Sequence, residues 1–239
     1  MSLQDPQGIP KKALPTTLSW STPGTHEWWC PADVGYISGV GVGAGGGGGG
    51  GKTGGAGSCG GGGGGGGHWS YFTLPVTPGA KYLMVIGAGG AQGSDNNDGA
   101  DGGTTSIQDA QGNILIAWAG GHKGLKGGNA SVGVGGAARG AGGAGGDGGN
   151  NTGGYDGSLG FQIKGSAGTG GPNDSSGYAG GGGGGASYGN GGNGQPRALT
   201  QGATSGVKGG GSGGAAANGG ASQCSGGDGY IEFSFRSIY

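Results

Sequence analysis

The chain has 239 residues, of which 79 are glycine, and its formal net charge at pH 7 is −1. Only 10% of the residues are charged, so the sequence lacks the basic footprint of proteins that bind nucleic acids or anionic membranes. Hydrophobic residues make up 31%, too few for a large conventional core. We therefore expect a thin fold that depends on main-chain hydrogen bonds.

The first segment, residues 1–24, is predicted to be an extended arm rather than part of a core. No apolar stretch typical of a signal peptide begins the chain, and no apolar run is long enough to span a membrane. Proline fixes the backbone in an extended region and a basic pair adds charge. The residues of this expected docking arm are Pro6, Pro10, Lys11, Lys12 and Pro15.

The remainder, residues 25–239, is predicted to form a glycine-rich β domain. Several segments alternate in polarity as strands do, and no segment has a helical period. Thr77-Pro78-Gly79 and Asp109–Gly112 are typical turn sequences, the first between two consecutive strand segments and the second within a hairpin. The predicted strands are Thr25–Cys30, Gly35–Val42, Trp69–Val76, Lys81–Ile86, Thr104–Gln108, Asn113–Ala119 and Gly229–Phe235. We expect the tryptophans Trp28, Trp29, Trp69 and Trp118 in the core of this β part.

Glycine runs separate the predicted strands, as in Gly45–Gly51, Gly60–Gly67 and Gly180–Gly185. Such runs either form a flexible linker or pack as extended polyproline-II-like legs whose amides bond to neighbouring legs. Collagen is excluded because the glycines do not recur at every third position. An eight-glycine run would span about 25 Å in polyproline-II geometry. The predicted fold is mostly β: short antiparallel strands in a sandwich-like part, joined to a bundle of glycine-rich legs, without significant helix.

Catalytic chemistry is not indicated by the sequence. The three cysteines and three histidines are widely spaced, and no catalytic, zinc or disulfide pattern is evident. Gly46–Thr53 formally matches a phosphate-binding loop, but the glycines after Thr53 cannot form the helix that this motif requires. Asp95–Asp98 with Asp101 offers oxygen ligands for a cation, although an exposed polar turn is the simpler interpretation. We predict a protein that is not an enzyme and that needs no cofactor or metal.

Several motifs in order resemble a known family. Trp28-Trp29-Cys30-Pro31 precedes Val34–Val42 and the first glycine run, and Leu74–Gly90 (LPVTPGAKYLMVIGAGG) is similar to that family's most recognisable segment. Gly102–Ile107 and Gly226–Phe233 fit its middle and its end. Together, over residues 25–236, they resemble the glycine-rich domain of bacteriophage tail-fibre and tail-tip proteins. A related idea is the polyglycine-rich adhesin that caps the long tail fibres of T-even-like phages.

The resemblance implies a virion structural protein at the tail fibre or tail tip, assembled in the host cytoplasm. It implies two kinds of partner: other phage tail or fibre proteins, and a bacterial surface receptor that is a protein or a glycan. Three copies around one fibre, as a homotrimer, and a single cap are both compatible with the sequence. No partner nucleic acid and no membrane insertion are expected.

Receptor binding is expected at loops displayed by a rigid body, since tyrosine gives a large contact area at low entropic cost. Each of these tyrosines has the alternative role of packing over glycine backbone. The candidate residues are Asp95, Asn96, Asn97, Asp98, Tyr155, Asp156, Asn173, Asp174, Tyr178, Tyr188 and Asn190. Two functions of another class remain as alternatives: an ice-binding polyproline-II bundle, which would favour evenly spaced repeats, and a structural matrix protein.

Overall fold

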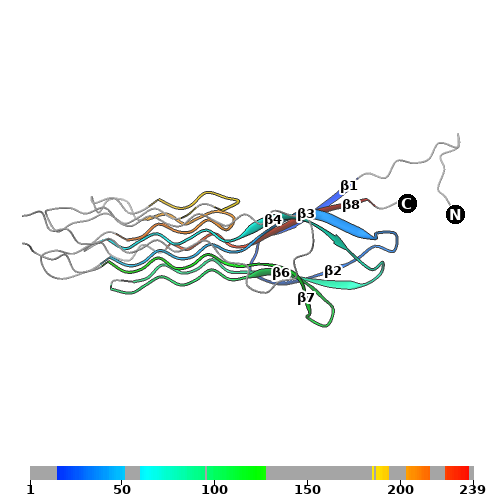
Figure 1. The fold of residues 1–239 in the computed structure, drawn as a ribbon, viewed down its shortest axis with the longest axis horizontal. Coiled ribbons are helices and arrows are strands. Elements are labelled where there is room, and N and C mark those ends of the chain that lie inside the picture. The colour runs from blue at the N-terminus through cyan, green and yellow to red at the C-terminus, as the bar shows by residue number, and fades with distance from the viewer. Residues whose placement is uncertain are drawn as a thin grey trace, which may run out of the picture.

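The computed structural model describes residues 15–51, 60–94, 96–127, 185, 187–193, 203–215 and 224–236. Within these ranges the regular structure is entirely β (Figure 1), in two four-stranded antiparallel sheets. The strands are β1 (Pro15–Trp20), β2 (Gly24–Trp29), β3 (Tyr36–Val42), β4 (Trp69–Pro75), β5 (Lys81–Ile86), β6 (Thr105–Asp109), β7 (Ile114–Trp118) and β8 (Tyr230–Arg236). One sheet has the order β1-β8-β3-β4 and the other β2-β5-β6-β7.

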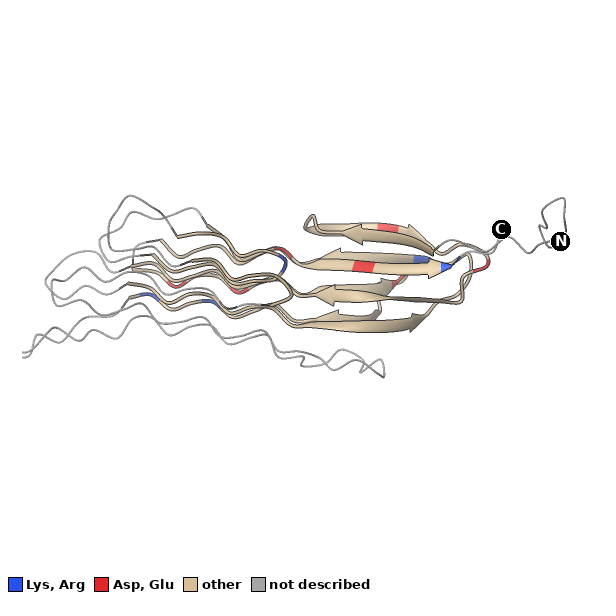
Figure 2. Cartoon of the chain, turned by 90° about the horizontal axis from the view of Figure 1, so that it is seen from above, with Lys and Arg blue, Asp and Glu red and all other residues tan. Residues whose placement is uncertain are grey.

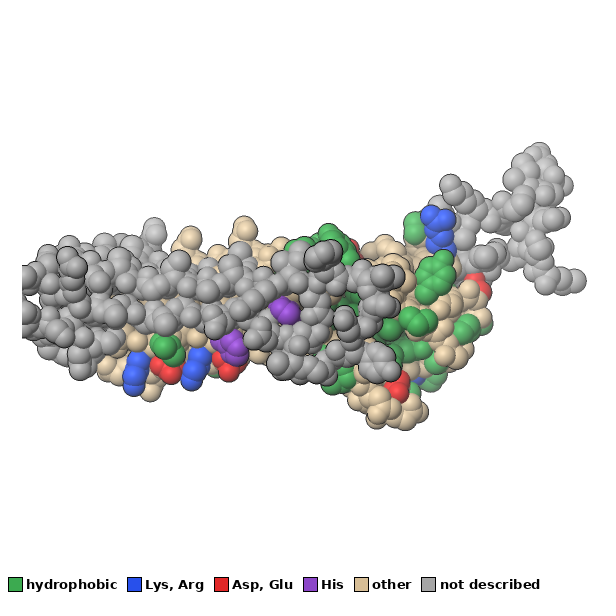
Figure 3. Space-filling view, viewed as in Figure 1, with side chains coloured by type: hydrophobic (Ala, Val, Ile, Leu, Met, Phe, Trp, Pro, Cys, Tyr) green, Lys and Arg blue, Asp and Glu red, His purple; other side chains and the backbone are tan. Residues whose placement is uncertain are grey.

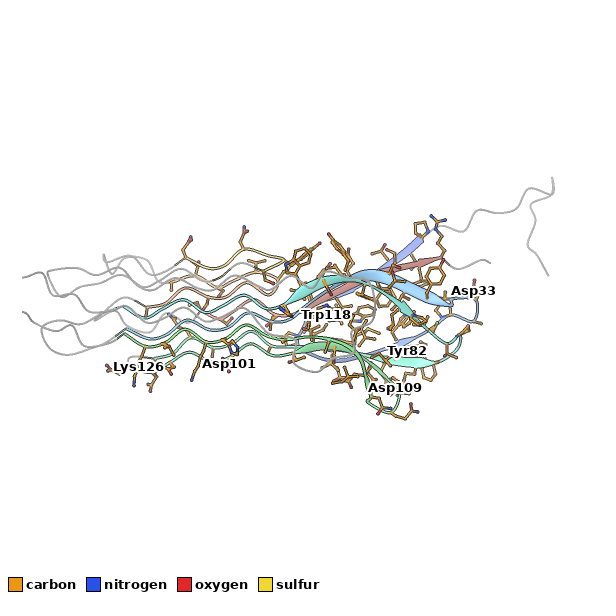
Figure 4. All side chains as sticks on the ribbon, viewed as in Figure 1. Asp33, Tyr82, Asp101, Asp109, Trp118 and Lys126 are labelled. Carbon is orange, nitrogen blue, oxygen red and sulfur yellow. The ribbon has the colours of Figure 1, made fainter. Side chains whose placement is uncertain are left out.

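The two sheets pack face to face over an aromatic and aliphatic core. Trp28 of β2 contacts Phe233 of β8 edge-to-face, with ring centroids 5.0 Å apart. At the end near the glycine bundle, Trp118 is fully buried and its indole N–H donates to Ser70 Oγ at 2.7 Å. Figure 4 shows Trp118 and Tyr82 between the two sheets. Because alternate residues of each strand face this core, the outer faces carry the intervening side chains.

The predicted strands are confirmed, within one or two residues at their ends, as β2 to β8. The hairpin turn 109–112 is also confirmed, since Asp109 Oδ1 accepts the amides of Gln111 and Asn113 at 2.9 Å. The Thr77–Gly79 turn is present as well, with Gly79 at φ 75°. However, the strands on its two sides, β4 and β5, lie in different sheets, so this turn crosses the sandwich.

One strand lies where the sequence predicted a free arm. Residues 15–20 form β1, which pairs with β8 from Pro15↔Arg236 to Trp20↔Ile231. Leu18 and Trp20 pack against the core, so the interpretation of residues 1–24 as lying wholly outside it is wrong for β1. The cause is long range, because the pairing partner lies at the other end of the chain.

Two tryptophans also differ from expectation. Trp28 and Trp118 are buried as predicted, but Trp29 is 63% exposed because neighbouring residues of a strand face opposite ways. Trp69 lies on the outer face of its sheet, beside a small cluster of Val40, Val42 and Tyr230.

Extended glycine-rich legs continue six of the strands and run away from the sandwich as one bundle (Figures 1 and 2). The leg after β3 (residues 43–51) lies at the centre. Its amides donate to main-chain carbonyls of three neighbouring legs, and its carbonyls accept from main-chain amides of three more. The six neighbours are residues 60–68, 87–94, 97–104, 119–127, 210–215 and 224–229.

The contacts of the central leg repeat every three residues. Ala44, Gly47 and Gly50 donate in turn to the carbonyls of Gly103, Ala100 and Asn97, and accept in turn from the amides of Gly121, Gly124 and Gly127. Distances in both series are 2.8–3.1 Å. A threefold repeat without internal hydrogen bonds is the geometry of a polyproline-II helix. Every third residue of the leg faces the same pair of neighbours, so the three sets of residues face three different pairs. Every direction around the leg is therefore occupied by another backbone.

Candidate functional site

The described part of the molecule has two opposite ends, the outer end of the sandwich and the tip of the bundle. Pro15 and Arg236 pair at the end of the β1–β8 ladder, whereas β8 begins at Tyr230, where the leg 224–229 enters the sheet. The described chain therefore starts and stops at the outer end of the sandwich, opposite to the bundle (Figure 1). The connections 52–59, 128–184, 194–202 and 216–223 lie outside the described residues, as does residue 186.

The predicted receptor-binding residues fall into three groups. Asn96, Asn97 and Asp98 lie at the far end of the bundle, where the leg after β5 turns back toward β6. Tyr188 and Asn190 lie instead near the start of β4, at the junction between bundle and sandwich. The structure does not bring these two groups together. Asp95, Tyr155, Asp156, Asn173, Asp174 and Tyr178 lie outside the described residues, as do Pro6, Pro10, Lys11 and Lys12 of the predicted arm.

The turn at Asn96 and Asn97 joins two antiparallel legs. Asn96 has φ 63°, in the left-handed region that asparagine tolerates better than most residues, and its amide donates to Gly51. The side-chain amide of Asn97 donates to Ser94 Oγ at 2.9 Å. Both side chains are exposed. These residues therefore form a well-bonded polar turn at the tip of the described bundle.

Acidic and basic side chains alternate along one flank of the bundle (Figure 3). Asp98 accepts the amide of Lys126 at 3.0 Å and pairs with the Lys123 ammonium at 3.3 Å. Asp101 lies three residues further on and accepts the amide of Lys123 at 2.8 Å, with the His122 ring nearby. Figure 4 shows Asp101 and Lys126 on this flank. The carboxylates thus bridge two neighbouring legs and fix their relative register.

The hydrogen bond from the Lys126 amide is the main cause that lowers the pKa of Asp98, with smaller contributions from the lysine charges and an opposing one from burial. Both aspartates of this flank are engaged by the neighbouring leg, which favours a structural role over the cation site considered from the sequence. In the described part of the chain, no cluster of three or more His, Cys, Asp or Glu side chains is arranged to hold a metal ion.

The glycines of the formal phosphate-loop match are part of the central leg. The amides of Gly46, Gly47, Gly49 and Gly50 donate to carbonyls of neighbouring legs, and that of Gly48 donates to Ser212 Oγ at 2.7 Å. A phosphate-binding loop presents its amides to the ligand. Because these amides are used within the bundle, the loop interpretation has no geometric basis at these five residues.

A row of aromatic rings that the sequence did not indicate lies at the junction. Trp69 contacts Tyr71 on one side, with ring centroids 5.7 Å apart, and Tyr188 on the other at 5.4 Å. Tyr188 in turn stacks on Tyr230 at 6.3 Å, and the Lys208 ammonium lies 4.3 Å from the Tyr230 ring centroid. Alternation could have placed Trp69 and Tyr71 outside, since Ser70 and Phe72 face the core. The approach of Tyr188 and Lys208 had no sequence signal.

Burial is the largest cause that raises the pKa of Tyr230 to about 12, and the neighbouring Glu232 carboxylate, which accepts from the Tyr230 hydroxyl, adds to it. Tyr230 is therefore a neutral hydrogen-bond donor at physiological pH.

Among the described residues there is no helix with the length and apolar character of a membrane span.

Comparison with known protein families agrees with the prediction of a glycine-rich domain. A family model described as a glycine-rich domain matches residues 21–236, which include seven of the eight strands and all the described legs. No curated protein matches the chain.

Proposed function

This chain belongs to the glycine-rich domain family, and on that premise we propose that it is a virion structural protein of a phage tail fibre or tail tip. In this proposal it acts as an adhesin that binds the host surface through loops on a rigid glycine-rich body. It is not an enzyme and carries no cofactor. Its partners are other tail or fibre proteins on one side and a bacterial surface protein or glycan on the other.

The described chain begins at Pro15 and ends at Arg236 on the side opposite to the bundle tip, and this placement is the observation that carries the proposal. A protein anchored through residues 1–14 or its C-terminal residues would project its bundle away from the anchor. The legs supply reach without side chains, and their mutual hydrogen bonds supply stiffness. A stiff spacer that carries the exposed turn of Asn96 and Asn97 at its far end suits attachment to a surface. An elastic matrix protein, in contrast, gains nothing from such a saturated bundle.

Adsorption is the experiment that tests the proposal. Purified full-length chain is added to bacteria before the phage particles that carry it, and unadsorbed particles are counted. We expect the protein to compete for adsorption. Replacing Asn96 by glycine and Asn97 by serine, which changes the exposed turn at the bundle tip, should abolish competition, while Tyr36→Ala at the anchored end serves as a matched control. Full competition by the variant of the Asn96–Asn97 turn, or none by the wild type, contradicts the proposal.

A further inference from the structure

The aromatic row at the junction consists of Trp69, Tyr71 and Tyr188. Among the described residues, no segment covers this row, so it forms an exposed surface. Tyr71 is 63% exposed on β4, which is an edge strand of its sheet. Trp69 is half-buried beside it, and Tyr188 beyond it is 38% exposed. Contiguous exposed aromatics on a protein with few hydrophobic residues indicate a binding surface, because solvent exposure forgoes the free energy of burying them.

A strained backbone positions the charge at the end of this row. Lys208 has φ 42°, in a region where a non-glycine residue costs energy, inside a turn closed by the Gly210 amide donating to Val207. The chain is rich in glycine, and the next residue, Gly209, also has positive φ. Lysine at this position therefore costs conformational free energy that glycine would avoid, and the conformation holds the lysine ammonium over the Tyr230 ring. Retained strain of this kind is typical of functional positions.

Hydrogen-bonding groups lie next to the rings on the same sheet face. The strand register places Thr17, Ser234, Ser38 and Thr73 in one row across the four strands. Thr17 Oγ1 and Ser234 Oγ are 2.8 Å apart, and Ser38 Oγ and Thr73 Oγ1 are 2.9 Å apart. Each such pair uses one of its two hydroxyl hydrogens, so one hydrogen remains for a group outside the pair. The next row toward the bundle contains Glu232 and Tyr71.

We propose that this face of the sandwich binds a saccharide. A pyranose ring has an apolar C–H face that packs on an aromatic ring and a rim of hydroxyls that bond to polar side chains. Trp69, Tyr71 and Tyr188 provide the platform, while Lys208, Glu232 and the hydroxyl row provide donors and acceptors at its edges. Rows are about 7 Å apart along a strand, which is the scale of one sugar ring. A stable protein partner would bury about 800 Å² on each side, which is more than three partly exposed rings offer.

This site lies on the side of the molecule and does not depend on the tip-binding function proposed above. It would persist if the tip recognised a protein receptor or no receptor at all. Conversely, a tip that binds the host would leave the side face unchanged.

Amide correlation NMR of the full-length chain tests the site, because each tryptophan indole gives its own signal. The probes are oligosaccharides of glucose, galactose and N-acetylglucosamine, and N-acetylneuraminic acid, added to tens of millimolar. We expect at least one probe to shift the Trp69 indole signal, assigned with Trp69→Phe, while the signal of buried Trp118 stays fixed. The Trp118 signal also reports that each variant is folded.

Matched variants then locate the contact. Tyr71→Ala and Tyr188→Ala should each weaken saccharide binding by about tenfold or more, as expected for aromatic anchors of a site. Tyr36→Ala should leave it unchanged, because Tyr36 lies on the same sheet face with 68% exposure but outside the row. A Trp69 signal that no probe shifts overturns the proposal, and so do equal affinities of Tyr71→Ala and Tyr36→Ala. Capture of a protein on this face that the saccharides cannot displace also overturns it.

Discussion

Replacing Gly47 by alanine tests whether the bundle depends on bare backbone. An ideal Cβ at this position would overlap the carbonyl oxygen of Ala91, and the carbonyl of Gly90 would lie 2.7 Å away. Both are main-chain atoms held by other legs, so no flexible side chain can move aside. The leg that contains Ala91 must therefore shift. Such a shift breaks or strains its two bonds to the central leg, from Gly90 to Gly45 and from Gly93 to Gly48, and the bond that Ala91 accepts from Ala100.

The magnitude follows from these bonds. Losing two to four main-chain hydrogen bonds at about 1 kcal/mol each destabilises the protein by roughly 2–4 kcal/mol. Alanine restricts the unfolded chain and returns about 0.4–1 kcal/mol. The net loss of about 1–4 kcal/mol lowers the melting temperature by roughly 2–16 °C for a domain of this size.

Gly35→Ala is the matched control. No atom lies within 4 Å of an ideal Cβ there, and its φ does not favour glycine. Thermal and urea unfolding of both variants, followed by tryptophan fluorescence, should show a loss for Gly47→Ala and a small gain for Gly35→Ala. Equal stabilities of the two variants would refute the argument that packed backbone holds the bundle together.

Three further predictions concern single side chains. Ser212→Ala should cost about 1–3 kcal/mol in the free energy of unfolding, because it leaves the buried Gly48 amide without its acceptor; a neutral result would contradict that bond. Asp98→Asn should reduce the free energy of unfolding at neutral pH. The difference from the wild type should shrink below the ordinary carboxyl value of 3.8 and vanish as the pH falls through the lowered pKa of Asp98, because the carboxylate stabilises the fold only while it is charged. In a Cys59→Ser background, the thiols Cys30 and Cys224, whose pKa values burial raises, should react with a disulfide reagent on the order of 100-fold more slowly than in denaturant. Comparable rates in the two solvents would show that these thiols are accessible.

The sequence predicts β2 to β8 well because alternation and turn residues are local signals. Asp109 and Gly79 illustrate this, since each acts within a few residues of itself. β1 could not be predicted in the same way, because its pairing with β8 joins residues such as Thr17 and Ser234, which are 217 positions apart. Its six residues include only two apolar side chains in alternation, Leu18 and Trp20, which give no strong pattern without that partner.

The bundle was predictable in kind but not in arrangement. Composition favours extended glycine legs, and in the described residues Ala44, Gly47 and Gly50 contact their neighbours with a threefold repeat. Which legs become neighbours is a different matter, because glycines have no side chains that could distinguish one leg from another. The order is instead imposed by the strands from which the legs emerge and by a few side chains such as Asp98, Asp101 and Ser212.

The candidate surfaces also divide into features that the local sequence predicts and features that depend on tertiary packing. Asn96 and Asn97 form an exposed polar turn, as a run of such residues favours. Tyr188 was expected among the loops but lies against Trp69 and Tyr230, because its segment returns to the sandwich. That return depends on tertiary packing, for which the polar and glycine-rich flanks carry no signal.

The pairing of β1 with β8 gives the molecule a defined mechanical axis. A pull on the bundle that is resisted at Pro15 passes from the leg 224–229 into β8 and crosses sideways into β1. The load then acts along both strands, so all six registered pairs from Pro15↔Arg236 to Trp20↔Ile231 must slide together rather than open one after another. The fold is thus built to resist traction along its length, while a sideways peel of β1 from its edge would need far less force.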